Sequence, residues 1–354
     1  MHSEYSPLRR GHVVRARAPL RLGLAGGGTD VSPYCDDFGG AVLNITLHRF
    51  AYAFIAPRTD RKVELRSSDL AISETLELGA PLRASPANQL HLGVYQRMMR
   101  DYCGGELLPL TITTHADAPP GSGLGTSSAI VVALVDAFRT LLDLPLGQYD
   151  VAWLAFQIER NDLGLAGGRQ DQYSAAFGGV NFMEFLPEER VIVNPLRIRQ
   201  GHVDELEASM VICFTGVSRH SSEIVVDQSS RMTANNRSTM DALHQLKADA
   251  ISMKSAMLNG DQTELTSIMQ RSWIAKKRTA TAVSNGIIDD LYDRALSYGA
   301  LAGKVSGAGG GGFMMFIATP ETRPGLLAAL RGTGVSAEAV QFTDKGSETW
   351  TRPA

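Results

Sequence analysis

Residues 119–129 read Pro-Pro-Gly-Ser-Gly-Leu-Gly-Thr-Ser-Ser-Ala and run directly into an apolar stretch, Ile130–Phe138. Glycine at alternate positions lets backbone N–H groups turn inward, because no Cβ atom obstructs them. Unpaired N–H groups and the positive end of a helix that starts here favour an anion, above all a phosphate. The stretch therefore predicts a cradle for the phosphates of a nucleotide. Its expected nucleotide-binding residues are Gly121, Ser122, Gly123, Leu124, Gly125, Thr126, Ser127 and Ser128.

This loop differs from two common nucleotide-binding loops. The P-loop pattern requires Gly-Lys before a Ser or Thr, and no lysine follows a glycine in this loop. A dinucleotide fingerprint is excluded, because Pro119-Pro120 ends the preceding segment and no ribose-binding acid follows at the usual distance. Thr126 or Ser127 could cap the helix that follows. Taken alone, the loop could also be a glycine-rich turn before a buried helix.

Length and composition indicate an ordinary globular protein. A chain of 354 residues is long for one hydrophobic core, so two domains in close contact are expected. Hydrophobic residues make up 44% and charged residues 20%, as in typical globular domains. The net charge of -3 argues against a general binder of nucleic acid or anionic membranes, which would carry a basic surplus. An anionic substrate would therefore need locally placed arginines.

The cysteines and the N-terminal residues bear on the compartment. Cys35, Cys103 and Cys213 are unevenly spaced and form no Cys-x-x-Cys pair. This spacing provides neither a disulfide framework nor a zinc site, and it suits a reducing cytoplasm. Residues 1–5 are polar with no apolar signal core, and no apolar run reaches the length of a membrane span. We therefore expect a cytoplasmic protein.

Apolar periodicity predicts a mixture of helices and strands. Strands are expected at Val13–Leu24, Ala41–Ile55, Lys62–Arg66, Leu107–Thr114, Val180–Phe185, Val191–Val193 and Ala208–Thr215. Helices are expected after the phosphate loop and at Gln89–Tyr102, Tyr149–Asn161, Asp171–Phe177, Met232–Leu258, Gln262–Lys277 and Gly286–Tyr298. The composition of the sequence changes near residue 205, which predicts a domain boundary there.

Two further glycine-rich segments strengthen the interpretation of the first. Lys304–Phe313 contains four consecutive glycines before an apolar strand. Such a run would weaken the strand unless the backbone closely approaches a ligand or another loop. Gly26–Asp30 ends in a carboxylate. Each segment alone could be a tight connection, but three in one chain indicate a common site.

The order of these segments resembles the GHMP family of small-molecule kinases, which includes galactokinase, homoserine kinase, mevalonate kinase and phosphomevalonate kinase. The family's three motifs correspond here to Ala18–Arg21, Pro119–Ala129 and Lys304–Gly311, so the match spans nearly the whole chain. The resemblance implies an α+β fold in two domains with the active site between them. Residues 1–204 would form the ATP-binding domain, which is ribosomal-protein-S5-domain-2-like with a left-handed crossover, and residues 205–354 a ferredoxin-like domain.

The same resemblance implies roles for individual side chains. In the family, a loop serine and a helix glutamate hold Mg²⁺, and Glu159 matches that glutamate. The serine is Ser127 when the loop is aligned from its left end and Ser128 when aligned from its right, and we favour Ser127. Asp171 resembles the aspartate that accepts the proton of the attacking hydroxyl. Arg21 matches the basic residue that stabilises this carboxylate and the transferring charge.

A sugar substrate is implied by the Gly-Gly-Thr-Asp sequence that ends at Asp30, which matches the sugar-binding aspartate of galactokinase-like members. Gly27 and Gly28 replace the Glu and His of galactokinases, which argues against galactose. The segment Gly26–Tyr34 looks like the subgroup of heptose 7-phosphate kinases, with fucokinase domains as near relatives. The expected substrate-binding residues are Arg17, Gly28, Thr29, Asp30, Arg169, Gly309 and Gly310, with Arg15 and Arg219 as further candidates for a substrate phosphate.

This subgroup implies ATP-dependent phosphorylation of the anomeric (C1) hydroxyl of D-glycero-D-manno-heptose 7-phosphate. The product, heptose 1,7-bisphosphate, would be a precursor of nucleotide-activated heptose for capsule and surface polysaccharide. The alternatives are a fucokinase-like or other free-sugar 1-kinase and a catalytically silent sugar sensor, against which the intact set of Arg21, Glu159 and Asp171 argues. ATP and Mg²⁺ are the expected cofactors and a sugar phosphate the expected partner. Nucleic acid and membranes are not expected, and a homo-oligomer is possible from the sequence.

Overall fold

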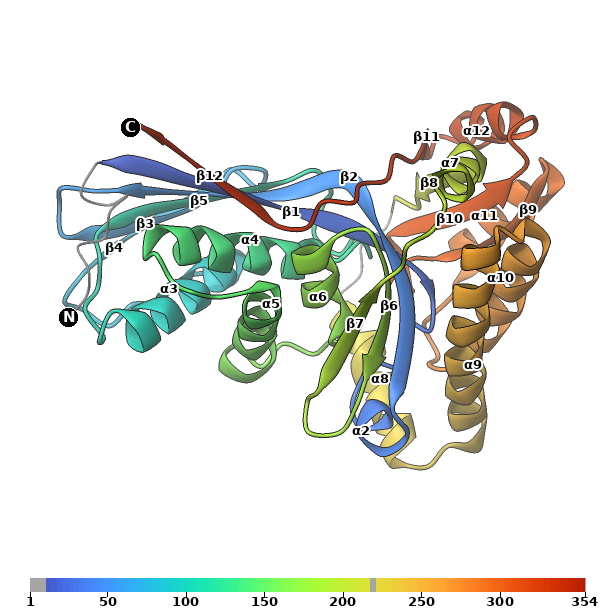
Figure 1. Cartoon of the computed structure of the whole chain (residues 1–354), viewed down its shortest axis with the longest axis horizontal. Helices are drawn as coiled ribbons and strands as arrows, with labels where there is room; N and C mark the ends of the chain where they lie inside the picture. Colours follow the sequence, from blue (N-terminus) through green and yellow to red (C-terminus); the bar gives the residue numbers. More distant parts are fainter. Residues whose placement is uncertain (1–10, 217–220, 354) are drawn as a thin grey trace.

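Two β-sheets with helices packed against them make up the molecule, and the computed structural model describes residues 11–216 and 221–353 (Figure 1). The larger sheet has the strand order β12-β1-β2-β5-β3-β4, and the hairpin β6–β7 joins it through β2. β3 and β5 are parallel, whereas the other neighbours are antiparallel. The strands are β1 (His12–Ala25), β2 (Gly40–Pro57), β3 (Lys62–Ser67), β4 (Ile72–Glu77), β5 (Leu110–Ala116), β6 (Val180–Phe185), β7 (Val191–Pro195) and β12 (Glu348–Pro353).

Most helices of the first half of the chain lie against one face of this sheet (Figure 1). They are the 3-10 turn Pro86–Asn88, α3 (Gln89–Tyr102), α4 (Thr126–Leu141), α5 (Gln148–Gln157), the π-helical turn Ile158–Asp162 and α6 (Gln170–Phe177). The short helix α2 (Tyr34–Phe38) lies apart from them, and its Tyr34 packs with residues of the second half of the chain. α4 is buried on almost every side, which explains why its sequence is apolar without a polar stripe. The main hydrophobic core therefore forms between α4, its neighbouring helices and the larger sheet.

The smaller sheet is antiparallel with the strand order β11-β8-β10-β9. A second core lies between this sheet and the helices α11 and α12. The elements are α7 (Gln200–Ser209), β8 (Met210–Phe214), α8 (Ser221–Thr233), α9 (Arg237–Asn259), α10 (Gln262–Lys276), α11 (Gly286–Ser297), β9 (Ala300–Val305), β10 (Phe313–Ala318), α12 (Arg323–Gly332) and β11 (Ser336–Ala339).

β1 connects the two halves of the molecule. Its residues alternate between buried and half-buried up to Arg17, and every residue from Ala18 to Ala25 is buried. The change occurs because α9 and α10 cover this end of the strand from the second half of the chain. The pairing of β1 with β2 shifts register between Pro19 and Arg21, and such irregularities redirect side chains. Arg21 consequently lies at the junction between the two halves.

Most of the expected elements are confirmed, with differences at their ends. The strand expected at Ala208–Thr215 is α7 followed by the shorter strand β8. The helix expected at Met232–Leu258 is broken, because Asn235 adopts a positive φ of 51° and the side chain of Asn236 caps α9. The C-terminal strand β12 pairs with β1 of the larger sheet, so the chain returns to its first half (Figure 1). The proposed boundary near residue 205 lies within α7.

Among residues 11–216 and 221–353, no helix combines the length and apolar character that crossing a membrane requires. The three cysteines are buried, and none of them forms a disulfide bond.

Candidate active site

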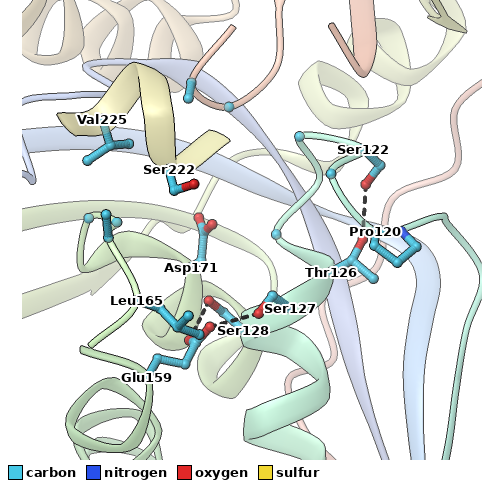
Figure 2. A pocket seen from close by; sticks show the side chains of 18 of the residues that line it. Pro120, Ser122, Thr126, Ser127, Ser128, Glu159, Leu165, Asp171, Ser222 and Val225 are labelled. Carbon is cyan, nitrogen blue, oxygen red and sulfur yellow. Dashed lines mark hydrogen bonds between the residues drawn. The ribbon is translucent and has the colours of Figure 1, made fainter. Parts of the chain in front are cut away.

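A cavity of about 640 Å³ lies where the three glycine-rich loops meet. Ser222 and Val225 of α8 line it as well, and in the view of Figure 2 Asp171 lies between Ser222 and the group formed by Ser127 and Glu159. The structure thus brings together most of the residues that the sequence nominates. Those that line the cavity are Arg21, Gly28, Asp30, Gly121, Ser122, Gly123, Gly125, Thr126, Ser127, Ser128, Glu159, Asp171 and Gly309.

The phosphate loop has the conformation that its glycines predict. Gly121, Gly123 and Gly125 have φ values of 71°, 77° and 77°, in the left-handed region that favours glycine. Gly125 precedes the first turn of α4, and no side chain among the described residues caps that helix. The N–H groups at its positive end therefore face the cavity without a side-chain partner, which suits a bound phosphate.

The expectation that Thr126 or Ser127 caps α4 is wrong. α4 already begins at Thr126, and Gly125 occupies the N-cap position. The hydroxyl of Thr126 instead lies 3.0 Å from that of Ser122, within the loop. The hydroxyl of Ser127 is directed to Glu159 (Figure 2).

The second glycine-rich segment packs against the first, as the run of glycines predicts. A Cβ atom on Gly123 would overlap the carbonyl of Ser306, and one on Gly312 would overlap the carbonyl of Ser122. The backbone N–H of Phe313 donates to the Ser122 carbonyl at 2.8 Å, and the hydroxyl of Ser306 donates to the Gly123 carbonyl at 2.9 Å. Contact between two loops thus accounts for these glycines.

Arg21 and Asp171 form an ion pair at the centre of the cavity. The Nε and Nη2 atoms of Arg21 each lie 2.7 Å from Oδ1 of Asp171. Arg21 is buried, and its third nitrogen donates to the carbonyl of Gly123 and to the hydroxyl of Ser306. The arginine therefore ties the carboxylate to both glycine loops. Oδ2 of Asp171 takes no part in this pair, and the carboxylate projects into the cavity (Figure 2).

Glu159 lies beneath the start of α4 in the π-turn that follows α5, a local structure frequent at functional sites. Its two oxygens accept hydrogen bonds from Ser127 at 2.9 Å and from Ser128 at 2.6 Å, and Gln172 donates to it as well. The two alignments of the loop thus place their serines on the same carboxylate. They differ in exposure, because Ser127 is exposed to the cavity while Ser128 is buried.

The donor set around Glu159 fits Mg²⁺ better than a transition metal. No cluster of three or more His, Cys, Asp or Glu side chains capable of holding a metal occurs in the described part of the chain. Mg²⁺ prefers oxygen ligands and commonly takes one or two protein ligands together with substrate phosphates and waters. The Ser127 hydroxyl and the Glu159 carboxylate beside the phosphate loop provide such a partial set.

Asp30 is buried, and its carboxylate is already saturated with N–H donors. Oδ1 accepts from the backbone of Gly28 at 3.1 Å and from the side chain of Gln170 at 3.2 Å. Oδ2 accepts from the backbone of Arg169 at 3.0 Å and of Gln170 at 3.2 Å. A carboxylate offers about four lone-pair positions, so these contacts use its capacity. In this structure Asp30 anchors the start of α6, the helix that carries Asp171.

Several predicted residues lie outside the cavity. Thr29 does not line it, and its hydroxyl bonds to the backbone of Gly26 and Ala41. Leu124 is buried in the core, while Gly310 lies between two lining glycines without lining the cavity itself. Arg219 falls outside the described residues.

Arg15 and Arg17 of β1 also point away from the cavity. Arg17 pairs with Glu348 of β12 at 2.7 Å, and Arg15 lies over the ring of Phe54. They occupy the half-buried face of the strand, before the register shift that redirects Arg21 into the site.

Arg169 lines a second cavity of about 630 Å³, which shares Asp30 and Gly167 with the first. Its Nη2 donates to Asp36 at 2.7 Å and to Ser32 at 3.1 Å. Arg160 lines both cavities and donates to the carbonyls of Gly168 and Leu165. Two arginine side chains thus lie among the residues that line the second cavity.

Two buried lysines complete the main cavity. Lys276, at the end of α10, donates to the carbonyl of Gly27 at 3.0 Å, and Lys304 of β9 donates to those of Gly23 and Leu24. Burial lowers the pKa of Lys276 to about 8, against the opposing effect of Asp30. Burial and the neighbouring positive charge of Lys276 lower the pKa of Lys304 to about 7. Lys276 was not expected from the sequence, because nothing around a single lysine at a helix end distinguishes it from a surface residue.

Family models match both halves of the chain. Residues 89–179 match the GHMP kinases N terminal domain, and residues 253–335 match the GHMP kinases C terminal domain. The chain is 41% identical to the D-glycero-alpha-D-manno-heptose 7-phosphate kinase of Campylobacter jejuni, over 96% of this chain and 99% of that protein.

Solved structures agree with this match. The crystal structure of a D-glycero-D-manno-heptose 1-phosphate kinase from Bacteroides thetaiotaomicron superposes with a TM-score of 0.80 at 42% identity, over 95% of this chain and 98% of that one. Galactokinase from Lactococcus lactis, at 18% identity and a TM-score of 0.72 over 95% of each chain, shares the fold. The chain therefore belongs to the GHMP kinase family and has its two-domain α+β fold.

Proposed function

We propose that the protein is an ATP-dependent kinase that phosphorylates the anomeric (C1) hydroxyl of D-glycero-D-manno-heptose 7-phosphate. The observation that carries the proposal is the placement of Asp171, which Arg21 holds in the same cavity that the phosphate loop and the Ser127–Glu159 pair line. Similarity over nearly the full length to a heptose 7-phosphate kinase supports the choice of substrate. The product, heptose 1,7-bisphosphate, would serve the formation of nucleotide-activated heptose for surface polysaccharide.

Phosphoryl transfer depends mainly on positioning and on electrostatic stabilisation. The phosphate loop and the start of α4 hold the ATP phosphates through backbone N–H groups. The second oxygen of Asp171 accepts the proton of the C1 hydroxyl while the C1 hydroxyl oxygen attacks the γ-phosphorus, and the bond between that phosphorus and the β-phosphate breaks to release ADP. Arg21 keeps the carboxylate in place and faces the charge that develops on the transferring group. Ser127 and Glu159 would hold Mg²⁺, which neutralises phosphate charge when bound.

The second cavity supports a substrate that already carries a phosphate. A sugar with its C1 hydroxyl at Asp171 can extend past Asp30 and Gly167, which both cavities share. Arg160 and Arg169 line the second cavity, and guanidinium groups suit the bidentate recognition of a phosphate. A free sugar such as fucose would place no phosphate group in this region.

The names of the two similar kinases place the phosphate of the substrate at different ends of the heptose. A coupled ATP-consumption assay should therefore compare heptose 7-phosphate, heptose 1-phosphate, fucose and galactose. We expect the highest kcat/KM with heptose 7-phosphate. Preferential turnover of heptose 1-phosphate or fucose would contradict the proposed substrate, and a failure to consume ATP with any of them would favour a silent sugar sensor.

A further inference from the structure

Gln170 has a buried amide oxygen without a hydrogen-bond partner. The residue precedes Asp171 at the start of α6, lines the main cavity and is 8% exposed. Its Oε1 atom accepts no hydrogen bond in the described part of the chain. An unsatisfied buried acceptor costs roughly 1–3 kcal/mol, so such a group next to a ligand cavity calls for a donor from the ligand.

The orientation of this amide is fixed by its neighbour. Nε2 of Gln170 donates to Oδ1 of Asp30 at 3.2 Å. A flipped amide would place its oxygen against a carboxylate, which only accepts hydrogen bonds. Oε1 must therefore face away from Asp30. Oε1 of Gln170 lies near Gly23, since a Cβ atom added to Gly23 would stand 3.7 Å from it. Because residue 23 is a glycine, it places no side chain beside this oxygen.

Lys276 lines the same cavity, and not all of its N–H groups are hydrogen-bonded to the described residues. Its ammonium group carries three N–H bonds, and within residues 11–216 and 221–353 its one hydrogen bond goes to the carbonyl of Gly27. The side chain is buried and lines the cavity, so a ligand bound there can meet the remaining donors. Gly27 and Gly28 admit this side chain, since a Cβ atom on Gly28 would stand 3.2 Å from Nζ. A buried ammonium with open donors requires an acceptor on the ligand.

We propose that Gln170 and Lys276 together read one hydroxyl of the sugar other than the hydroxyl that is phosphorylated. The amide oxygen of Gln170 accepts the hydroxyl proton, and the ammonium of Lys276 donates to the hydroxyl oxygen. A hydroxyl is the sugar substituent that satisfies both requirements, because it donates and accepts at once. Gln170 and Lys276 are accordingly specificity-determining residues. The inference rests on the proposed kinase function and adds the group by which the enzyme selects among sugars.

Sites built to bond a hydroxyl reject analogues that lack it far more strongly than apolar pockets reject an extra methylene. The wild-type enzyme should therefore be assayed on the 2-, 3-, 4- and 6-deoxy forms of heptose 7-phosphate. We expect one of these analogues to lose about 100-fold or more in kcat/KM. The kcat/KM of the corresponding deoxyfluoro sugar should lie between that of the deoxy sugar and that of the parent sugar. Fluorine retains an acceptor for Lys276 but offers no proton to Gln170. This comparison needs no variant enzyme.

Variants then locate the contact. In Lys276→Met, the penalty for that one deoxy position should shrink to less than about tenfold, while the penalties at the other positions persist. Lys277→Met is the matched control, because Lys277 adjoins Lys276 but has a partly exposed side chain that lies over Trp273 outside the cavity. ATP affinity should be the same in both variants, because neither lysine touches the phosphate loop. Gln170→Met should act on the same deoxy position as Lys276→Met.

Equal deoxy penalties in wild type and Lys276→Met would overturn the inference, as would a flat response to all deoxy analogues in the wild type. The proposed function fails by a different result, namely the absence of turnover of heptose 7-phosphate itself. If the enzyme prefers another sugar in the substrate panel, the wild type and the variants are compared on the deoxy forms of that sugar. This comparison then decides whether Gln170 and Lys276 bind a hydroxyl.

Discussion

The two carboxylate oxygens of Asp171 have different surroundings. Oδ1 is held by two nitrogens of Arg21, and Oδ2 is the oxygen that we propose accepts the proton of the substrate hydroxyl. Asp30 accepts hydrogen bonds from the backbone at the start of the same helix, so the proposed catalytic carboxylate is fixed through both its side chain and its main chain. A general base fixed in this way needs little reorganisation when the hydroxyl arrives.

The substitution Asp171→Asn removes the proton acceptor and keeps the shape of the side chain. We expect kcat to fall by about 10²–10⁴-fold, the range that a positioned base contributes. The affinities for ATP and sugar, measured by calorimetry, should change little. Transfer at the wild-type rate with normal binding would show that Asp171 is not the base.

Ser127 and Ser128 can be separated because one is exposed to the cavity and the other is buried. Ser127→Ala should raise the Mg²⁺ concentration needed for half-maximal activity by about tenfold or more, since even outer-shell changes cost metal affinity on this scale. Ser128→Ala should instead lower the free energy of unfolding by about 1–3 kcal/mol, because it leaves Glu159 and Gln172 short of a buried partner. Metal titrations and denaturant unfolding of both variants test this assignment, and the reverse pattern would make Ser128 the metal ligand.

The sequence predicts the residues of the site that lie in contiguous motifs. Arg21, Asp171 and Glu159 stand in recognisable segments, and the structure brings all three to one cavity. Gln170 and Lys276 could not be predicted from the sequence. Gln170 is singled out by an amide oxygen that lacks a partner among the described residues and Lys276 by its burial, and both features arise only when the two halves of the chain pack together. Arg17 was expected to bind a substrate phosphate, whereas in the structure it pairs with Glu348 and does not line the cavity.

Among the secondary-structure elements, β9 places Lys304 in a buried position, where the charged form of a lysine is unfavourable. Lys304 is buried, donates to two carbonyls of β1 and faces the positive groups Lys276 and Arg21, with Asp249 as the opposing charge. Its pKa falls from the ordinary 10.5 to about 7. Between these two values the unfolded chain holds the proton and the folded protein has released it. Raising the pH from about 7 to 10 therefore favours the folded state through this group.

This effect can be measured against Lys304→Met. We expect the free energy of unfolding of the wild type, relative to the variant, to rise as the pH increases from 7 to 10. Denaturant unfolding at several pH values gives the difference directly. Identical pH slopes for the two proteins would contradict the burial of a proton-releasing lysine at this position.

Helices and strands with strong periodicity follow from the sequence. Gln89–Tyr102 is α3 and Val180–Phe185 is β6, with the bounds that the pattern predicts. The strands β11 and β12 were not expected, because their sequences are short, polar or half-exposed and obtain their structure from pairing with β8 and β1. Local propensity cannot report such long-range pairing.

At the scale of the whole molecule, the chain crosses between its two halves more than once. After β11, the C-terminal segment passes close to the end of α6, where a Cβ atom on Gly346 would overlap the carbonyl of Ala176. β12 then covers β1, and Glu348 pairs with Arg17 (Figure 1). The last residues thus protect an edge of the larger sheet and brace the helix that carries Asp171.

Deletion of residues 348–354 should expose that edge. We expect the free energy of unfolding to fall by at least about 2 kcal/mol, since several ladder hydrogen bonds of about 1 kcal/mol each are lost. Glu348→Ala is the control, because it removes a half-exposed ion pair worth less than about 1 kcal/mol. Equal stability of the deletion and of Glu348→Ala would show that β12 adds little to the sheet.

The central claim is that phosphate is transferred to the anomeric hydroxyl of a sugar that already carries a phosphate. Its most direct test is mass spectrometry and ³¹P NMR of the product formed from ATP and D-glycero-D-manno-heptose 7-phosphate. We expect a heptose bisphosphate whose new phosphorus signal couples to the anomeric proton, and loss of that product in Asp171→Asn. A bisphosphate with the new group on another carbon, or no bisphosphate at all, would contradict it.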